Sequence, residues 1–301
     1  MVSSKRLVQC VPNFSEGRNK DIIQQIISPI KDSTHVKLLD YQSDPNHNRL
    51  VVTLIGPPEA VADPLIQAIG AAVRLIDMNT HHGDHPRMGA VDVVPFIPLM
   101  NMDMADAVRL SKEVAKRVAA TFDLPIFLYE ASAVAPHRID LADIRKGEFE
   151  HMAGKMTKVD WRPDYGPDHP HPTAGVTAMG ARPPLIAFNV NLRTEDMDIA
   201  RTIAGKVRHR GGGFRYCKAI GVALKDKQMV QVSMNMTNFK NTSLSSVFEM
   251  IRAEAARYGV TIAGSEIVGL CPMEALKDVA TYYLGLHEFP MEQIIESRLI
   301  E

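Results

Sequence analysis

The order of hydrophobic patterns along the chain is the feature that most constrains its fold. Short apolar runs bounded by turn residues are typical of buried strands, and apolar residues recurring every three or four positions are typical of helices. In the first half these patterns follow one another as strand, helix, strand, strand, helix, strand. The predicted elements are residues 7–12, 22–30, 36–41, 49–55, 61–76 and 91–99. This order is the split unit of ferredoxin-like α/β sandwiches.

The second half of the chain repeats the same order without clear sequence identity to the first. Its predicted elements are residues 185–192, 194–208, 218–223, 229–236, 244–251 and 261–270. Thr194 is the predicted N-cap of the first helix there, with Glu195 and Asp196 in its first turn. With 301 residues, the chain is long enough for two domains. We therefore predict an α/β fold of two ferredoxin-like βαββαβ subdomains, residues 1–184 and 185–301.

The region between the two units carries further elements and then an irregular stretch. The patterns predict a helix over residues 104–122, a strand over residues 125–129 and short helices after it. Residues 161–184 contain so many prolines and glycines that we predict no regular structure there. Two interpretations of this stretch stay open, a flexible linker and a binding loop at the domain junction. The second is supported by four ring-bearing side chains, Trp161, Tyr165, His169 and His171.

The charge balance and the cysteines exclude several classes of protein. The chain has 34 Lys and Arg against 35 Asp and Glu, a formal net charge of −1, so no overall field attracts nucleic acid or an anionic membrane. No uncharged apolar run approaches the roughly 20 residues of a membrane helix, and the N-terminus lacks a signal-peptide core. The three cysteines are widely spaced and form neither a disulfide framework nor a zinc knuckle. We expect a soluble cytoplasmic protein without a nucleic-acid or membrane partner.

The sharpest concentration of chemically active side chains lies at residues 81–92, HHGDHPRMGAVD. Three of the eleven histidines fall within five residues of it. An imidazole titrates near neutral pH, and Asp84 and Asp92 are candidates to orient such a ring. Arg87 adds a cation that fits an anionic substrate. The set favours general acid/base catalysis on an anion.

Two other interpretations of this cluster remain open, a metal site and a solvated polar loop. The spacing approaches the HxHxDH pattern of dinuclear metallohydrolases, but His81 and His82 are adjacent and would point apart in extended backbone. No HExxH helix or cysteine ligand set accompanies them. We therefore expect no metal in this site.

A second cluster, residues 206–218, combines five Lys or Arg, three consecutive glycines and the rings of Phe214 and Tyr216. Backbone amides and positive charge in such a loop can hold an anion, with a ring for stacking. A solvated helix end followed by a loose turn is the alternative, because basic residues are already favoured at helix C-termini. The pattern alone does not decide between the two.

Several strings in the chain are specific enough to be compared with a family. Two of them are long, CVPNFSEGR at residues 10–18 and HPRMGAVDVVPFIPL at residues 85–99. Shorter strings accompany them: LLD at 38–40, GPPE at 56–59, RLIDM at 74–78, DWRPDYGP at 160–167, LIAFNVNL at 185–192 and IVGLCPMEAL at 267–276. Together they resemble the glutamate formimidoyltransferase family over essentially the whole chain.

The resemblance implies an enzyme that transfers the formimino group of N-formimino-L-glutamate to N5 of tetrahydrofolate. The products would be L-glutamate and 5-formiminotetrahydrofolate, in the breakdown of histidine to glutamate. The resemblance also implies two ferredoxin-like subdomains around a substrate crevice, a homodimer, and tetrahydrofolate as co-substrate. Animal members carry a cyclodeaminase fused to the transferase; we expect the stand-alone form here, with a separate cyclodeaminase acting on the product.

The resemblance further assigns roles to individual residues. The family's catalytic histidine corresponds to His85, which would act as general acid/base and be oriented by Asp84 or Asp92. The family's folate-binding segments correspond to Gly166, Pro167, Asp168, His169, Pro170, His171, Pro172, Thr173, Ala174 and Gly175, and to Gly212, Gly213, Phe214, Arg215, Tyr216, Cys217, Lys218, Ala219, Ile220 and Gly221.

Five basic residues are candidates to bind the anionic groups of the two substrates. Arg49, Arg87 and Arg182 are predicted to hold the carboxylates of formiminoglutamate, because a planar guanidinium fits a carboxylate. Arg215 and Lys218 are predicted to meet the glutamate tail of the folate.

The sequence leaves two alternatives to this activity. One is a related folate enzyme that exchanges formyl between 5-formyltetrahydrofolate and glutamate, because the formimino and formyl carbons differ by NH against O. The other is a non-catalytic folate-binding protein, in which the histidine cluster would be incidental.

Overall fold

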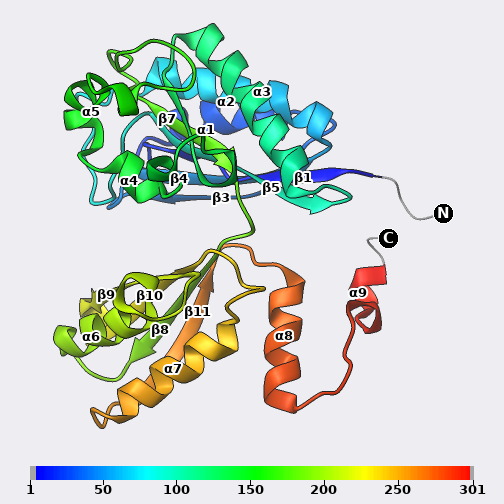
Figure 1. Cartoon of the computed structure of the whole chain (residues 1–301), viewed down its shortest axis with the longest axis vertical. Coiled ribbons are helices and arrows are strands. Elements are labelled where there is room, and N and C mark those ends of the chain that lie inside the picture. Colours follow the sequence, from blue (N-terminus) through cyan, green and yellow to red (C-terminus); the bar gives the residue numbers. More distant parts are fainter. Residues whose placement is uncertain (1–4, 299–301) are drawn as a thin grey trace. The chain divides into compact units, whose positions relative to one another are not determined.

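The computed structural model describes residues 5–298, which divide into two compact units (Figure 1). The N-terminal unit ends at Arg182 and the C-terminal unit begins at Pro183. Among the described residues, no helix combines the length and the hydrophobicity needed to span a membrane.

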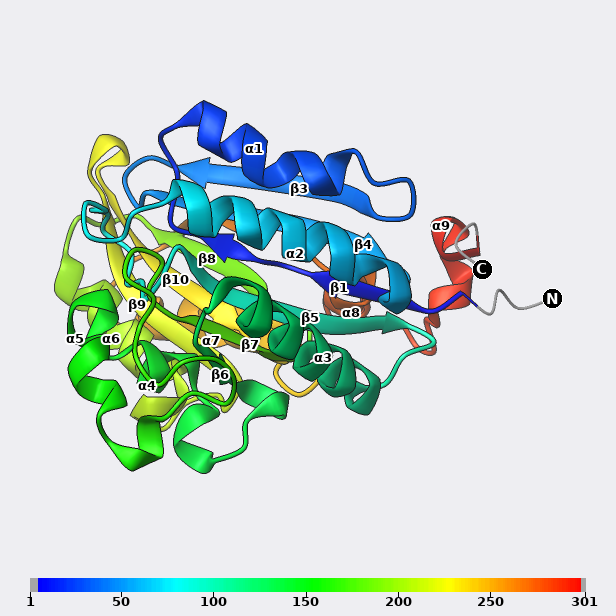
Figure 2. The same ribbon diagram turned by 90° about the horizontal axis from the view of Figure 1, so that it is seen from above.

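The N-terminal unit is built on an antiparallel sheet in which β1 and the short β2 lie in line between β4 and β5, with β3 outside β4. The strands are β1 (Leu7–Cys10), β2 (Asn13–Phe14), β3 (Lys37–Asp44), β4 (Arg49–Gly56) and β5 (Val91–Met100). Helices α1 (Lys20–Lys31) and α2 (Pro58–Leu75) lie side by side over the sheet (Figure 2). The isoleucines of α1 that recur along one face are buried in the core beneath it. The predicted first βαββαβ unit is confirmed.

Further elements extend this sheet beyond β5. Helix α3 (Met104–Phe122) lies beside α2, and the strands β6 (Ile126–Leu128) and β7 (Thr177–Ala181) follow it. Strand β7 lies between β5 and β6 and is parallel to both. The connection from β6 to β7 includes two helices, α4 (Leu141–Arg145) and α5 (Glu148–Met156).

The prediction that residues 161–184 lack regular structure is wrong for β7, and the interpretation as a flexible linker fails with it. No proline interrupts residues 173–182, and every residue of β7 is buried. A central strand finds hydrogen-bond partners on both sides, which outweighs the effect of prolines before and after it. Gly180 permits the close packing, because a Cβ there would lie 2.2 Å from the carbonyl oxygen of Tyr129.

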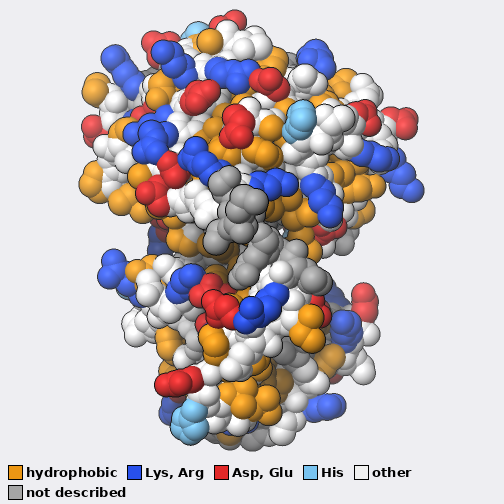
Figure 3. All heavy atoms as spheres, turned by 90° about the vertical axis from the view of Figure 1, so that its right-hand side faces the viewer, with side chains coloured by type: hydrophobic (Ala, Val, Ile, Leu, Met, Phe, Trp, Pro, Cys, Tyr) orange, Lys and Arg blue, Asp and Glu red, His pale blue; other side chains and the backbone are white. Residues whose placement is uncertain are grey.

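The C-terminal unit repeats the topology, with the antiparallel strand order β11, β8, β10, β9. Its elements are β8 (Ile186–Leu192), α6 (Met197–Val207), β9 (Cys217–Leu224), β10 (Met229–Met236), α7 (Leu244–Ala256), β11 (Ile262–Val268), α8 (Met273–Leu284) and α9 (Ile295–Arg298). The predicted second unit is confirmed. The N-cap of α6 is Asp196 and not the predicted Thr194, because the Asp196 carboxylate accepts the N–H of Asp198 at 2.9 Å. Charged side chains of both signs are interspersed on the face that Figure 3 shows.

Candidate active site

The histidine cluster lies in the loop from α2 to β5, residues 77–90, called the His loop below. The end of this loop is bonded to the segment 166–175, because Ala90 N donates to the carbonyl oxygen of Ala174 at 2.9 Å. Gly89 lets the two backbones approach, since a Cβ there would lie 2.6 Å from the same carbonyl oxygen. The structure therefore brings together two of the regions that the sequence singles out.

The turn between β3 and β4, residues 45–48, holds another side of the His loop. Asn48 adopts a left-handed conformation there, with a φ of 47°, and its side-chain amide donates to the His82 carbonyl oxygen at 3.1 Å. A Cβ at Gly83 would lie 2.2 Å from the carbonyl oxygen of His47. The loop is thus fixed by backbone contacts from two directions.

His85 is partly buried in this loop, and one hydrogen bond sets its tautomer. Its Nδ1 lies 2.7 Å from the carbonyl oxygen of Pro86, which can only accept, so Nδ1 carries the proton and Nε2 keeps its lone pair. Burial, followed by the positive charges of Arg49 and Arg145, lowers the pKa of His85 to about 4. A neutral imidazole with Nε2 as acceptor is the form required of a general base.

Neither Asp84 nor Asp92 orients this ring as predicted, because the Pro86 carbonyl holds its Nδ1. Asp92 is fully buried in β5, and its Oδ2 accepts from Arg49 at 2.9 Å and from Arg145 at 2.7 Å. Burial opposes the ionisation of Asp92, but the two arginine charges outweigh it and hold its pKa below the ordinary value. Asp92 therefore positions two arginines whose charges act on the histidine.

Two of the three arginines predicted to bind substrate carboxylates lie in this region. Arg49 also donates through Nε and Nη2 to the side-chain oxygen of Asn13, at 3.1 and 2.8 Å. Arg182 follows β7 and hydrogen-bonds the side chain of Tyr129, whose pKa burial raises to about 12. The positive charges of Arg182 and Arg145 both oppose this rise in the pKa of Tyr129. Tyr129 is therefore influenced both by Arg182 and by one of the two arginines bound to Asp92. The roles of Arg49 and Arg182 toward a substrate stay predictions.

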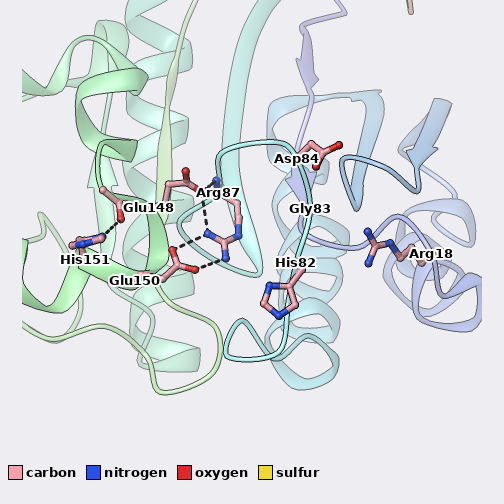
Figure 4. A pocket seen from close by; sticks show the side chains of 9 residues that line it. Arg18, His82, Gly83, Asp84, Arg87, Glu148, Glu150 and His151 are labelled. Carbon is pink, nitrogen blue, oxygen red and sulfur yellow. Dashed lines mark hydrogen bonds and ion pairs between the residues drawn. The ribbon is translucent and has the colours of Figure 1, made fainter. Parts of the chain in front are cut away.

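The third arginine, Arg87, is occupied by the protein itself (Figure 4). Its guanidinium donates to Glu148 at 2.9 Å and to Glu150 at 2.8 and 2.5 Å. Its remaining donors lie 3.3 Å from the carbonyl oxygen of His81 and 3.4 Å from His81 Nδ1. All five N–H donors therefore have protein partners. The prediction that Arg87 binds a substrate carboxylate is wrong; it ties the His loop to α5.

The two glutamates on Arg87 line one side of an open pocket of about 640 Å³. Arg18, His82 and Asp84 line its other side (Figure 4). His82 and Asp84 are exposed there, and His85 is not among the described residues that line this pocket. Asp84 therefore belongs to the wall of a separate pocket beside the His loop.

His81 is a structural residue of the His loop. Its Nε2 lies 3.0 Å from the carbonyl oxygen of Asn48, and its Nδ1 accepts from Arg87, so both ring nitrogens are engaged. Burial lowers the pKa of His81. Within residues 5–298, no group of three or more His, Cys, Asp or Glu side chains is arranged to hold a metal ion. Protein contacts alone account for the position of His81.

The first predicted folate segment, residues 166–175, has an exposed tip and a buried base. Asp168 and His169 are exposed, with 3.1 Å between the Asp168 carboxylate and His169 Nδ1. Ala174 is fully buried in the core, and its N–H donates to the ring of His171 at 3.0 Å. The tip is therefore the part of the segment whose side chains can meet a ligand.

The second predicted folate segment lies in the C-terminal unit and runs from a loop into β9. Gly212 adopts a left-handed conformation in the loop, with a φ of 88°. Along β9 the side chains alternate: Cys217 and Ala219 are buried in the core, whereas Lys218 and Ile220 are exposed. The side chains of Cys217 and Ala219 therefore face the core, and those of Lys218 and Ile220 face away from it; the role of the segment toward folate stays a prediction.

The sequence interpretation missed several residues that build this site. Asn13 directly follows the predicted strand 7–12, and Tyr129 ends the predicted strand 125–129. A polar side chain at the end of a predicted buried strand is the signal by which both could have been identified. Arg145 has no such signal, because it lies 53 residues from Asp92 in a region predicted only as short helices. Glu148 and Glu150 belong to the same region.

The low pKa of His85 leads to a pH prediction. In an NMR titration of the ring C–H signals, the His85 signal should titrate with a midpoint of about 4, below the ordinary value of 6.5. The signal is assigned by its absence in the His85→Gln variant. Between these two pH values the unfolded chain binds a proton at this group and the folded chain does not, so its contribution to stability declines as the pH falls. A midpoint at or above 6.5 would contradict burial and the arginine charges as controlling influences.

Comparison with known proteins relates these residues to a family. Residues 7–182 match the family model "Formiminotransferase domain, N-terminal subdomain", and residues 187–300 match "Formiminotransferase domain". The chain is 51% identical over 296 residues to the glutamate formimidoyltransferase of Streptococcus pyogenes serotype M1, over 98% of this chain and 99% of the relative. It is 45% identical to that of Thermoplasma acidophilum, over 97% of each chain. It is 41% identical to the formimidoyltransferase-cyclodeaminase of Dictyostelium discoideum, over 98% of this chain and 56% of the relative. The chain therefore belongs to the formiminotransferase family.

Proposed function

We propose that this chain is a glutamate formimidoyltransferase. It transfers the formimino group of N-formimino-L-glutamate to N5 of tetrahydrofolate, with L-glutamate and 5-formiminotetrahydrofolate as products. The observation that carries the proposal is the neutral imidazole of His85, held by Pro86 with Nε2 as proton acceptor, in a chain whose relatives bear the name of this activity.

The transfer needs one group that removes a proton and then returns one. N5 of tetrahydrofolate attacks the amidine carbon, and the new C–N bond forms while Nε2 of His85 takes the N5 proton. The resulting imidazolium returns the proton to the glutamate nitrogen as the old C–N bond breaks. Glutamate leaves with its nitrogen as an amine, and the neutral imidazole is restored for the next turnover.

The charge around His85 supports the binding of an amino acid with two carboxylates. Arg49 and Arg182 are the proposed carboxylate ligands. The exposed parts of each folate segment are proposed to contact tetrahydrofolate, which acts as co-substrate. Arg215 and Lys218 are the proposed contacts of its glutamate tail.

We also propose that the enzyme acts in histidine degradation, in the cytoplasm and as a homodimer. Its proposed formiminotransferase subdomains are residues 1–184 and 185–301. The separate family-model matches to the two halves of the chain support this division.

The test is a stopped assay on metal-stripped protein with formiminoglutamate and tetrahydrofolate. Acid converts 5-formiminotetrahydrofolate to 5,10-methenyltetrahydrofolate, whose absorbance reports the product, and turnover is expected. A parallel reaction with 5-formyltetrahydrofolate and glutamate tests formyl exchange. Turnover in the second reaction alone would overturn the choice of donor, and silence in both would contradict a transferase.

A further inference from the structure

The buried carboxylate of Asp92 binds two positively charged side chains but neutralises only one positive charge. The Asp92 group, defined as Asp92, Arg49 and Arg145, places two guanidinium groups on one carboxylate oxygen, which gives a net charge of +1. The exposed fraction of the Asp92 side chain is 0%, that of Arg49 is 9%, and that of Arg145 is 15%. An unneutralised cation in such surroundings favours an anionic ligand.

Arg145 is the member of the Asp92 group with most hydrogen-bonding capacity to spare. Among the described residues, its side chain makes one hydrogen bond, the 2.7 Å contact with Asp92, and its Nε is buried without a partner. A guanidinium has five N–H donors, and all five are engaged in Arg87 of the same unit. Arg138 also has a buried Nε without a partner, but its other donors bond Asp164 and two carbonyl oxygens. Within the described part of the chain, Arg145 has only the bond to Asp92 and belongs to a group of net positive charge, so its remaining donors can bind an anionic ligand.

The backbone that carries Arg145 is fixed independently of its side chain. Arg145 is the last residue of α4. Lys155 Nζ donates to the carbonyl oxygens of Asp143 and Ile144 in the same turn, both at 2.6 Å. The same ammonium lies 3.8 Å from the centre of the Trp161 ring. The guanidinium is therefore held in place before a ligand arrives, which reduces the entropy lost on binding.

We propose that Arg145 binds the α-carboxylate of the formiminoglutamate substrate. This inference rests on the proposed function and adds a residue to it. Arg49 and Arg145 are the cations whose charges act on His85. The reacting nitrogen of the substrate is bonded to the carbon that carries the α-carboxylate. A nitrogen within hydrogen-bond reach of His85 therefore brings this carboxylate, and not the distal one, toward the arginines.

Binding of the carboxylate also changes the proton affinity of His85. The groups that face His85 are Arg49, Arg145, Asp92 and the His47 ring, whose centroid lies 5.8 Å from that of His85. A carboxylate on Arg145 offsets one positive charge, so the pKa of His85 in the substrate complex should lie above that in the free enzyme. The acid limb of kcat should therefore lie at a higher pH than the acid limb of kcat/KM.

The test compares substrates that differ by one carboxylate. N-formimino-4-aminobutyrate lacks the α-carboxylate, and N-formimino-2-aminobutyrate lacks the distal one. Arg145→Gln should lower kcat/KM by about 10²-fold or more for formiminoglutamate and for the 2-aminobutyrate compound. The same variant should leave kcat/KM for the 4-aminobutyrate compound nearly unchanged, because this substrate has no α-carboxylate contact to lose. The KM for tetrahydrofolate should match that of wild type.

Arg138→Gln is the matched control. Arg138 is also a buried arginine on an aspartate, with 2.9 Å to Asp164, and its Nε is also buried without a partner. Its loss should reduce stability without changing the ratio of kcat/KM between the substrates. If Arg145→Gln does not fold, Arg145→Lys replaces it in the test. Because lysine keeps the charge but lacks the planar guanidinium, this variant should lose less kcat/KM, and only for the substrates with an α-carboxylate.

Two outcomes would overturn the inference while the proposed function stands. An equal loss for all three substrates in the Arg145 variants would reduce Arg145 to a structural residue. A loss confined to the substrates with a distal carboxylate would contradict the α-carboxylate assignment. Absence of transfer from formiminoglutamate by the wild-type enzyme would instead overturn the proposed function itself.

Discussion

Replacing His85 by glutamine should lower kcat for formimino transfer by about 10²- to 10⁴-fold, because the reaction loses its proton carrier. Glutamine keeps a polar side chain but has no basic nitrogen lone pair that can accept the N5 proton. The measurement is the initial rate of product formation in the stopped assay. Tetrahydrofolate affinity, measured separately by binding, should change little.

His82→Gln is the matched control for this variant. His82 is an exposed residue of the same loop and lines the pocket beside Arg87, so its replacement should leave kcat close to that of wild type. The thermal midpoints of both variants show whether a lost rate reflects unfolding. Equal kcat values for His85→Gln and His82→Gln would contradict the role of His85 as proton carrier.

Replacing Asp92 by asparagine should reduce the free energy of unfolding by about 3–5 kcal/mol, the usual cost of removing one partner from a buried ion pair. The variant leaves Arg49 and Arg145 together in a buried region without their carboxylate. It also disturbs the acceptor of the Met88 N–H, which donates to Asp92 at 3.1 Å. Urea unfolding followed by circular dichroism measures the difference.

Asp63→Asn provides the comparison for an exposed ion pair. Asp63 lies 2.6 Å from Arg117 on the surface, and the loss expected there is about 0–1 kcal/mol. The pKa of Asp92 is lowered in the folded state, so its contribution to stability is present above 3.8, the ordinary value, and is lost as the pH falls through the folded value. The difference in the free energy of unfolding between wild type and Asp92→Asn should therefore become smaller in acid. A loss no larger than that of Asp63→Asn would contradict the role of Asp92 as a buried counter-ion.

The sequence predicts those elements of the fold in which hydrophobic side chains recur at a regular spacing. The isoleucines of α1 recur along one face, and the doubled βαββαβ order follows from elements of that kind. Strand β7 escapes such reasoning because prolines and glycines surround it in the sequence. Its strand conformation depends on β5 and β6, which pair with it from distant parts of the chain.

The candidate site shows the same division between local and distant information. His85 follows from its motif, but the carbonyl that sets its tautomer belongs to Pro86, and a backbone acceptor leaves no signature in a sequence. Asp92 also lies in the motif, whereas its arginine partners are 43 and 53 residues away. Arg87 resembles a substrate ligand only until α5 is in place, when Glu148 and Glu150 take three of its five donors and His81 takes the other two. Spacing predicts which residues matter, and tertiary contacts decide what each of them does.

The position of β7 in the sheet sets the order in which the site can assemble during synthesis. Strands β1 to β5, with Arg49 and Asp92 among them, are complete once Met100 has left the ribosome. Among the described strands, β6 pairs with β7 alone, so β6 cannot join the sheet until Ala181 has been made. Arg145 lies in the connection between these two strands. A nascent chain short of this point exposes the edge of β5, the strand that carries Asp92, to wrong pairing.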